Sequence, residues 1–176
     1  ALKLIGKTVS AEDVLKEAVK DLPFYWNSGG GITLTGGEPL MQPDFTAEVL
    51  KLCKEKGIHT AIETSGYTNW ENIAKVLPFT DLFLYDIKHM VSSKHRELVG
   101  VSNELILENA ERISGMDKPM VIRMPVVPGF NDSDDNIRAT AEFAAQLKSL
   151  ERIELLPYHN LGEPKYERLG LRYDLK

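Results

Sequence analysis

The residues with the clearest chemical potential in this sequence are Gly36-Gly37-Glu38-Pro39, which follow the short apolar run from Ile32 to Thr35. The apolar run predicts a buried strand, and the glycines and the proline predict a tight turn directly after it. Because glycine has no side chain, a ligand can approach the backbone C=O and N–H groups, and Glu38 offers a negative charge to an ammonium group. A purely structural turn, in which Glu38 only caps the helix that follows, explains the same residues.

Helix and strand patterns alternate along the whole chain, which is typical of parallel strands joined by crossover helices. The run from Leu82 to Ile87 is too apolar for a strand that is exposed on either face. Ser10 is predicted to cap the first helix, and Pro23 follows its end. The expected strands are residues 32–35, 59–64, 82–87, 120–127 and 153–156, and the expected helices are residues 10–22, 44–56, 70–76, 103–114 and 133–148.

Polar residues recur where the predicted strands end, and they are Glu38, Glu63, Thr64, Asp86, Lys88, Arg123 and His159. The carboxyl ends of parallel strands meet on one side of a sheet or barrel, where ligands bind, so these residues are expected to lie together. Each also has a structural explanation: Lys88 can pair with Asp86, and Arg123 can pair with a neighbouring carboxylate. His159 can be a hydrogen-bonded loop residue. Repetition over five successive strands favours a shared site.

Composition sets the broad class of protein. The chain has 176 residues, of which 43% are hydrophobic and 27% charged, as expected for one soluble globular domain. A net charge of -5 without a basic run argues against nucleic acid and anionic membranes as partners. The start, Ala1-Leu2-Lys3, has no signal-peptide pattern, so a cytoplasmic location is expected. The single cysteine, Cys53, excludes an intramolecular disulfide and a multi-cysteine metal site in this chain.

Five motifs stand in one order along the chain: Gly36-Gly37-Glu38-Pro39, Glu63-Thr64-Ser65-Gly66, Asp86-Ile87-Lys88, the segment from Arg123 through Pro128-Gly129-Phe130-Asn131-Asp132, and Leu155-Leu156-Pro157-Tyr158-His159. Together they resemble the radical S-adenosylmethionine (SAM) activating enzymes of glycyl radical enzymes, over nearly the whole chain. The alternation of elements and the resemblance imply an α/β fold. The expected domain is a single partial parallel (β/α) barrel of the radical SAM type over residues 1–176.

The resemblance implies a role for each matching residue in binding SAM. Gly36, Gly37 and Glu38, in the turn closed by Pro39, match the site that receives the methionyl amino group. Lys88, with Asp86 and Ile87 around it, matches the group that meets the methionyl carboxylate. Glu63 and Thr64 match an acid and a threonine near that carboxylate and near a monovalent cation. The acid is commonly aspartate, so the longer glutamate weakens the expectation of a cation. Arg123, Pro125 and His159 match contacts to the ribose and adenine.

The resemblance also implies a reaction and partners. A four-iron four-sulfur (4Fe-4S) cluster reduces the sulfonium of SAM, and the resulting 5′-deoxyadenosyl radical takes hydrogen from a glycine of the partner enzyme. The expected partner is a glycyl radical enzyme, with pyruvate formate-lyase as the default, and the expected electron donor is reduced flavodoxin or ferredoxin. No acid–base catalytic residue is required.

The sequence departs from this family in one respect. The family holds its cluster with a Cys-x3-Cys-x2-Cys loop, and these 176 residues contain no such loop. Cys53 shares a helix face with Val49 and Leu52 and is predicted to be a core thiol. The chain ends at Asp174-Leu175-Lys176 without an evident closing element. We therefore expect a middle and later part of a longer activase, without the first strand, the cluster loop and the C-terminal segment, and inactive by itself. The alternative is a relative that naturally lacks the cluster.

Two other functions are compatible with the residues. In an aldolase-like barrel, Lys88 would form a Schiff base with Asp86 as its acid–base neighbour, but this leaves the Gly36–Pro39 turn and His159 unexplained. A binding module would hold SAM or a protein partner without turnover. In an incomplete barrel, the first strand would be an unpaired edge of the sheet. Exposed strand edges favour dimerisation or the binding of another element.

Overall fold

The computed structural model describes residues 6–173 and contains a five-stranded parallel sheet with strand order β1-β2-β3-β4-β5. The two chain ends on which the expectation of a longer protein rests lie outside the described residues. The strands are β1 (Gly31–Leu34), β2 (His59–Thr64), β3 (Leu82–Asp86), β4 (Met120–Val126) and β5 (Leu150–Pro157). The helices are α1 (Ala11–Ala18), α2 (Leu22–Ser28), α3 (Pro43–Glu55), α4 (Trp70–Val76), α5 (Ser92–Val99), α6 (Glu104–Gly115), α7 (Asp134–Ala144) and α8 (Glu163–Arg168), with short 3-10 turns at Val19–Asp21, Pro39–Met41 and Leu77–Phe79.

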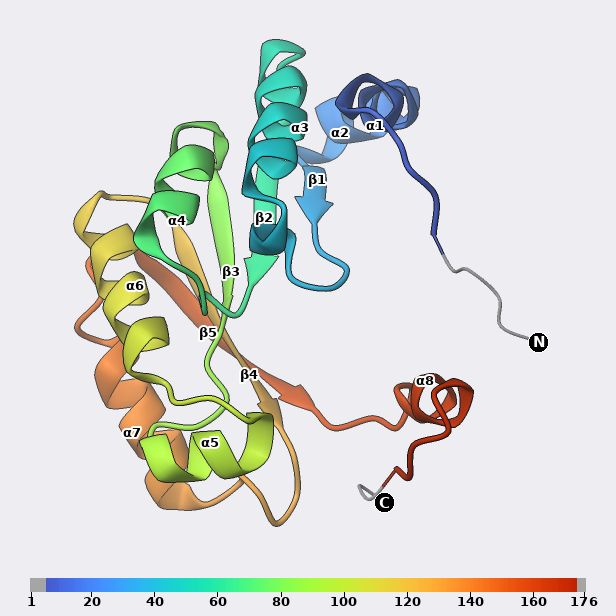
Figure 1. Cartoon of the computed structure of the whole chain (residues 1–176). Coiled ribbons are helices and arrows are strands. Elements are labelled where there is room, and N and C mark those ends of the chain that lie inside the picture. The colour runs from blue at the N-terminus through green and yellow to red at the C-terminus, as the bar shows by residue number, and fades with distance from the viewer. Residues whose placement is uncertain (1–5, 174–176) are drawn as a thin grey trace.

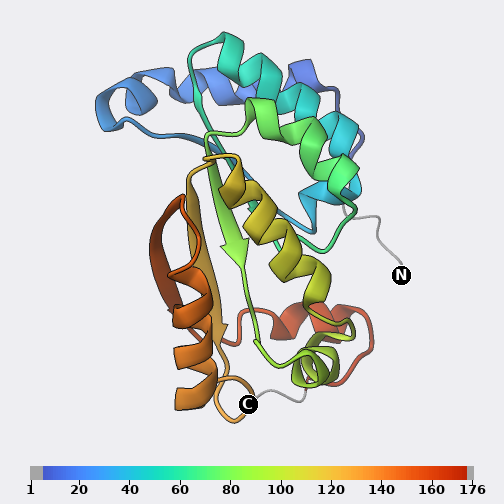
Figure 2. The ribbon, with the colours of Figure 1, turned by 90° about the vertical axis from the view of Figure 1, so that its left-hand side faces the viewer.

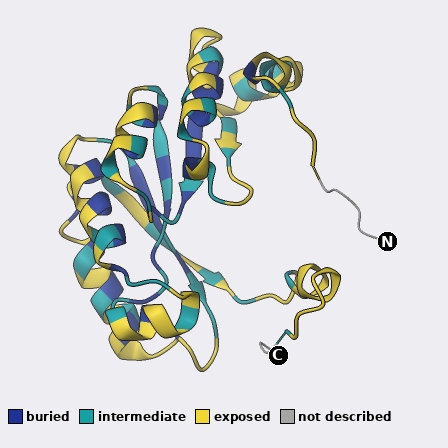
Figure 3. Ribbon diagram, viewed as in Figure 1, coloured by how far each residue is buried: buried dark blue, intermediate teal, exposed yellow. Residues whose placement is uncertain are grey.

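The hydrophobic core lies between one face of the sheet and the helices α3, α4, α6 and α7, which run along that face (Figures 1 and 2). Side chains alternate along a strand, so every second residue points into this core. Phe83 and Tyr85 of β3 are fully buried there, against Ile73 of α4 and Ile113 of α6. Figure 3 shows the buried residues concentrated along this layer. A second cluster packs α1 and α3 against β1.

The third strand was expected to be exposed on neither face, and none of its residues is exposed. Phe83 and Tyr85 are buried, whereas Leu82, Leu84 and Asp86 are partly buried. The difference follows from the architecture: helices cover one face of the sheet, and the opposite face remains open on the concave side of the partial barrel (Figure 1). The apolar composition of the strand matches a parallel sheet, but half of its side chains line the open face.

Several helix boundaries differ from those expected. The first helix ends at Ala18, and Pro23 lies in the first turn of α2, where a missing N–H leaves no hydrogen bond unmade. The helix expected to reach residue 148 ends at Ala144, and its last turn tightens into hydrogen bonds from Gln146 and Leu147 to the carbonyls three residues earlier. Helices α5 and α8 were not expected, because polar side chains dominate both segments. Ser10 and Ser133 cap α1 and α7 as predicted.

Strand β1 forms one edge of the sheet, as the sequence predicted, and it pairs only with β2 among the described strands. The opposite edge is β5, which pairs with β4 through a register that shifts between Met120 and Val121. Within residues 6–173, no helix combines the length and the apolar character that crossing a bilayer requires.

Candidate functional site

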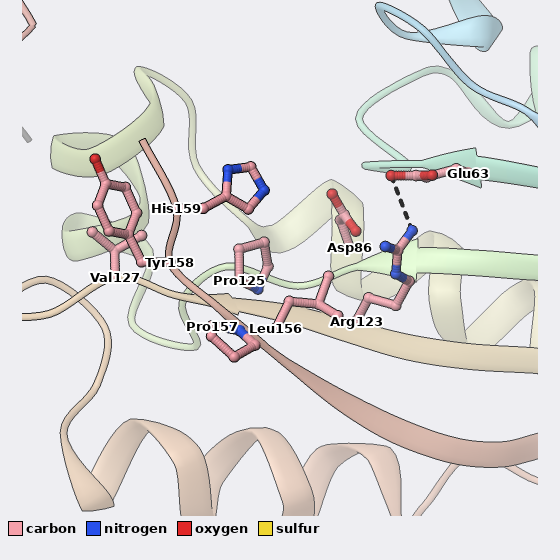
Figure 4. Close-up of a pocket in the computed structure, with 9 residues that line it drawn as sticks. All are labelled: Glu63, Asp86, Arg123, Pro125, Val127, Leu156, Pro157, Tyr158 and His159. Atoms are coloured by element: carbon pink, nitrogen blue, oxygen red, sulfur yellow. Dashed lines mark ion pairs between the residues drawn. The ribbon is translucent and has the colours of Figure 1, made fainter. Parts of the chain in front are cut away.

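Two adjoining cavities open at the carboxyl ends of the strands, where the polar residues were expected to converge. The smaller, of about 210 Å³, is lined by Thr35, Gly36, Gly37, Glu38, Glu63, Thr64, Ser65, Asp86 and Lys88. The larger, of about 520 Å³, is lined by Glu63, Asp86, Arg123, Pro125, Val127, Leu156, Pro157, Tyr158 and His159 (Figure 4). Glu63 and Asp86 line both cavities, so the two form one continuous site with a polar end and a more apolar end.

The structure brings together ten of the twelve residues expected from the sequence. Pro39 lies instead along a neighbouring cavity of about 340 Å³, which Gly37 and Glu38 also line. Ile87 is 1% exposed and packs into the helix-covered core, so its side chain reaches neither cavity. Ile87 directly follows Asp86, and consecutive residues of an extended chain point to opposite sides of the sheet. The three-residue motif therefore contributes only Asp86 and Lys88 to the cavity walls.

Glu38 ties the loop after β1 to the loop after β2. Its Oε1 accepts hydrogen bonds from Thr64 Oγ1 at 2.7 Å and from Leu40 N at 3.2 Å. Its Oε2 accepts from the Ser65 backbone N at 2.9 Å and from Ser65 Oγ at 2.8 Å. The bond from Leu40 is the structural cap considered above, at the start of the 3-10 turn Pro39–Met41. Four donors occupy the acceptor positions of this carboxylate, but its negative charge remains. A ligand ammonium group would therefore be attracted by that charge and would donate its hydrogen bonds to the neighbouring backbone carbonyls.

The glycine turn leaves its backbone open to the smaller cavity. Gly36 has φ of 126°, which a residue with a side chain rarely adopts, and both Gly36 and Gly37 line the cavity wall. A Cβ atom at either position would meet nothing within 4 Å. Glycine is therefore required at position 36 by backbone conformation, and the open space beside both residues is available to a ligand.

Lys88 and Asp86 form an ion pair at the boundary between the cavities. The distance from Lys88 Nζ to Asp86 Oδ2 is 3.1 Å, and both side chains are partly buried. This confirms the pairing that the sequence had offered as a structural explanation for Lys88. The pair also places a cationic group on the wall of the smaller cavity, where it can meet a carboxylate or phosphate.

Arg123 lies between two carboxylates on the open face of the sheet. Its Nη1 is 3.0 Å from Glu63 Oε1 (Figure 4), and its Nε is 3.7 Å from Glu154 Oε2. The Nε atom is buried and has no hydrogen-bond partner. Glu154 is held in turn by Arg152, whose Nε and Nη2 each lie 2.8 Å from Glu154 Oε1. Glu63 is thus the carboxylate partner expected for Arg123 from the sequence. Glu154, on the neighbouring strand β5, lies near the same guanidinium group.

The larger cavity has mainly apolar walls, with His159 and Tyr158 beyond β5. Pro125, Val127, Leu156 and Pro157 supply flat apolar surfaces suited to a planar ring. A hydrogen bond with Tyr173, 2.6 Å away, raises the pKa of Tyr158 to about 12. Tyr158 was part of a quoted motif but was not expected in the site.

Comparison with known proteins identifies the family. The Radical SAM superfamily profile matches residues 5–144. The chain belongs to the radical SAM superfamily. It is 44% identical, over its whole length, to the choline trimethylamine-lyase activating enzyme of Oleidesulfovibrio alaskensis, and it covers 58% of that protein. It is 42% identical, over 97% of its length, to the pyruvate formate-lyase-activating enzyme of Clostridium pasteurianum, and it covers 71% of that protein.

A solved structure carries the same likeness. The crystal structure of a domain of pyruvate-formate lyase-activating enzyme from Bacteroides vulgatus aligns with a TM-score of 0.69 at 38% identity, over 81% of this chain and 96% of that one. The resemblance to activating enzymes of glycyl radical enzymes, and the partial radical SAM fold, are confirmed. The chain spans 58% of the length of the Oleidesulfovibrio alaskensis relative and 71% of the length of the Clostridium pasteurianum relative.

The superfamily implies SAM and a 4Fe-4S cluster, and the residues present fit only the first. Cys53 is the single cysteine of the chain. It is fully buried in α3, and burial raises the pKa of its thiol, as expected for a core thiol. A cluster requires several thiolates, so these residues do not hold one. Within residues 6–173, no group of three His, Cys, Asp or Glu side chains is arranged to bind a metal ion.

Proposed function

We propose that residues 31–159 form the SAM-binding part of an activating enzyme for a glycyl radical enzyme. The observation that carries this proposal is the pair of adjoining cavities. One end offers glycine backbone, a carboxylate and the Lys88 ammonium, and the other offers apolar walls with His159. A SAM molecule has the same division, with a zwitterionic methionyl group at one end and adenine at the other.

In this arrangement the residues that line the two cavities bind or orient the ligand. The methionyl ammonium would lie against the carbonyls of the Gly36–Gly37 turn and the charge of Glu38, and the methionyl carboxylate would meet Lys88. Arg123 would face the ribose from its position between Glu63 and Glu154, and the adenine would lie against Pro125 and near His159. When bound, the cluster would supply the electron that cleaves SAM, and its ligands are not among these 176 residues.

The partner would be a glycyl radical enzyme. The relatives' names give a choline trimethylamine-lyase and a pyruvate formate-lyase as the enzymes that they activate. Those names differ in the enzyme that is activated although both relatives are more than 40% identical to this chain. The partner is therefore proposed only as a class, and reduced flavodoxin or ferredoxin is proposed as the electron donor. The Schiff-base alternative also places Asp86 beside Lys88, as the structure does. It is not proposed, because the relatives reported above are activating enzymes.

Calorimetric titration of the chain with SAM tests the binding part of this proposal. Lys88→Met should weaken binding by roughly tenfold, because it removes a charge-assisted contact worth about 1.5 kcal/mol. Lys94→Met is the matched control, since Lys94 also pairs with a carboxylate, Glu97 at 3.0 Å, but is exposed on α5 and lines neither cavity. No binding by the unmodified chain, or equal losses in the two variants, would contradict the proposal.

The activase step needs the complete gene product with a reconstituted cluster. Incubated anaerobically with SAM, a reductant and a purified glycyl radical enzyme, it should generate a glycyl radical signal in the electron paramagnetic resonance spectrum. The 176-residue chain alone should give no signal under the same conditions, because its one cysteine cannot hold the cluster.

A further inference from the structure

One buried amide joins the loops that follow β3 and β4. Asn131 is 1% exposed, and its Nδ2 donates hydrogen bonds to the carbonyl oxygens of Lys88 and Pro125, each at 2.7 Å. Lys88 lines the smaller cavity and Pro125 the larger. A single side chain therefore fixes the backbone beside both ends of the site.

The position of Asn131 is itself determined by the surrounding structure. Its Oδ1 accepts from Val127 N at 2.7 Å, so each polar atom of the amide is used. Its backbone N donates to Val127 O at 3.3 Å, and its backbone O accepts from Asn136 Nδ2 at 3.0 Å. Asn136 lies in the first turn of α7, which Ser133 caps. The backbone of Asn131 is thus held by a residue in the first turn of α7.

We propose that Asn131 is a positioning residue that sets the separation between the two ends of the site. This inference rests on the proposed function, because it concerns how far apart the Lys88 and Pro125 ends of a bound SAM molecule are held. A ligand that engages both ends gains from a fixed spacing, since the second contact forms at no further cost of orientation. A ligand that engages one end only gains nothing from it.

A nearby asparagine provides a matched control. Asn103 is 2% exposed, and its Nδ2 donates to the carbonyl oxygens of His89 at 2.9 Å and Met90 at 2.8 Å. It therefore makes the same two-carbonyl clamp on the same loop after β3, with similar burial and distances. His89 and Met90 line neither cavity. The loss of either amide removes buried hydrogen bonds, three at Asn131 and two at Asn103, and should destabilise the fold, but only the loss at Asn131 should affect ligand spacing.

The experiment measures dissociation constants of Asn131→Ala and Asn103→Ala for two probes. S-adenosylhomocysteine spans both ends, and 5′-deoxyadenosine occupies the adenosine end only. Asn131→Ala should weaken S-adenosylhomocysteine binding by about tenfold or more and change 5′-deoxyadenosine binding by less than about twofold. Asn103→Ala should change both by less than about twofold. Equal weakening of both probes by Asn131→Ala, or the same pattern in Asn103→Ala, would overturn the proposal.

Two further measurements keep the result interpretable. Urea unfolding shows whether each variant is folded, and Asn131→Ser, which keeps one donor, replaces the alanine variant if that one is not. If the unmodified chain binds neither probe, the proposed function fails, and the crystal structure of the variant then decides the inference. An unchanged separation between the Lys88 and Pro125 backbones would refute positioning by Asn131, and an increased separation would support it.

Discussion

Gly66 allows a single methyl group to test the packing beneath the site. It follows Thr64 and Ser65 in the loop after β2, and its φ is 68°. A Cβ atom there would overlap the Tyr85 hydroxyl group and ring and would lie 2.7 Å from Cε2. Tyr85 is fully buried and its hydroxyl donates to Ile106 O at 2.6 Å, so the ring has little room to retreat. We predict that Gly66→Ala is severely destabilising.

The magnitude follows from three contributions to the free energy of unfolding. Left-handed backbone at an alanine costs about 1 kcal/mol. Overpacking of a filled core costs about 1–3 kcal/mol, and a displaced tyrosine hydroxyl that loses its acceptor costs about 1–3 kcal/mol. Gly66→Ala should therefore lose about 3–7 kcal/mol, which is comparable to the whole stability of many domains.

Gly57→Ala isolates the packing contribution. Gly57 has nearly the same φ, 70°, but a Cβ atom there would meet nothing within 4 Å. It should lose only about 1 kcal/mol. Urea denaturation followed by circular dichroism measures both variants, and the expected difference is at least about 2 kcal/mol. Equal losses would show that Tyr85 does not restrict the loop and would refute the packing argument.

Three other perturbations follow from the structure. Hydrogen bonds from Ser102 and Ser92 lower the pKa of Glu104 to about 2 from 4.5. The folded pKa lies below the unfolded one, so the stabilisation by the Glu104 carboxylate is complete above about pH 4.5. It is lost as the pH falls towards 2. Denaturation measured across this range should therefore show a free energy of unfolding that depends less on pH in Glu104→Gln than in the unmodified chain. Glu38→Gln turns an amide NH2 towards hydrogen-bond donors, so the free energy of unfolding in urea should fall by about 1–3 kcal/mol. The control Glu48→Gln, at an exposed position, should leave it nearly unchanged. The unpaired edge of β1 should give concentration-dependent association in sedimentation velocity, and a monodisperse monomer at high concentration would contradict it.

The sheet and the convergence of the site could be predicted because they depend on local patterns. Short apolar runs separated by amphipathic stretches define parallel strands, and polar residues at the strand ends then meet at one rim. Glu63 and Arg123 illustrate this, since they lie 60 positions apart in the numbering and still form an ion pair of 3.0 Å. Strand alternation would also have excluded the Ile87 side chain, because neighbouring residues of a strand face opposite sides.

The supporting residues could not be predicted, because they depend on register and on loop geometry. Glu154 lies opposite Arg123 only after the shift between Met120 and Val121, which no residue pattern indicates. Asn131 acts through the backbone carbonyls of Lys88, in the loop after β3, and of Pro125, in β4, and a carbonyl has no residue identity in the sequence. The signal in the sequence is the motif from Pro128 to Asp132, which contains Asn131 but does not indicate which carbonyls it contacts.

The charge balance of the two cavities gives a last prediction about the ligand. Their walls carry three carboxylates, of Glu38, Glu63 and Asp86, and two cations, of Lys88 and Arg123. These five side chains together carry one net negative charge. SAM carries one net positive charge because of its sulfonium, whereas S-adenosylhomocysteine is neutral. If the site binds SAM, the excess charge should favour SAM by about 1 kcal/mol, or about fivefold in the dissociation constant, at low ionic strength.

Salt separates this attraction from shape. The two ligands differ by one methyl group and one charge, so they fill the cavities almost equally, and only the electrostatic part of the preference should fall as salt is added. Titration of both ligands at about 0.01 M and about 1 M ionic strength, where the screening lengths are about 30 Å and about 3 Å, measures the change. A ratio of dissociation constants that stays the same at both salt concentrations would show that the unpaired negative charge does not select the sulfonium.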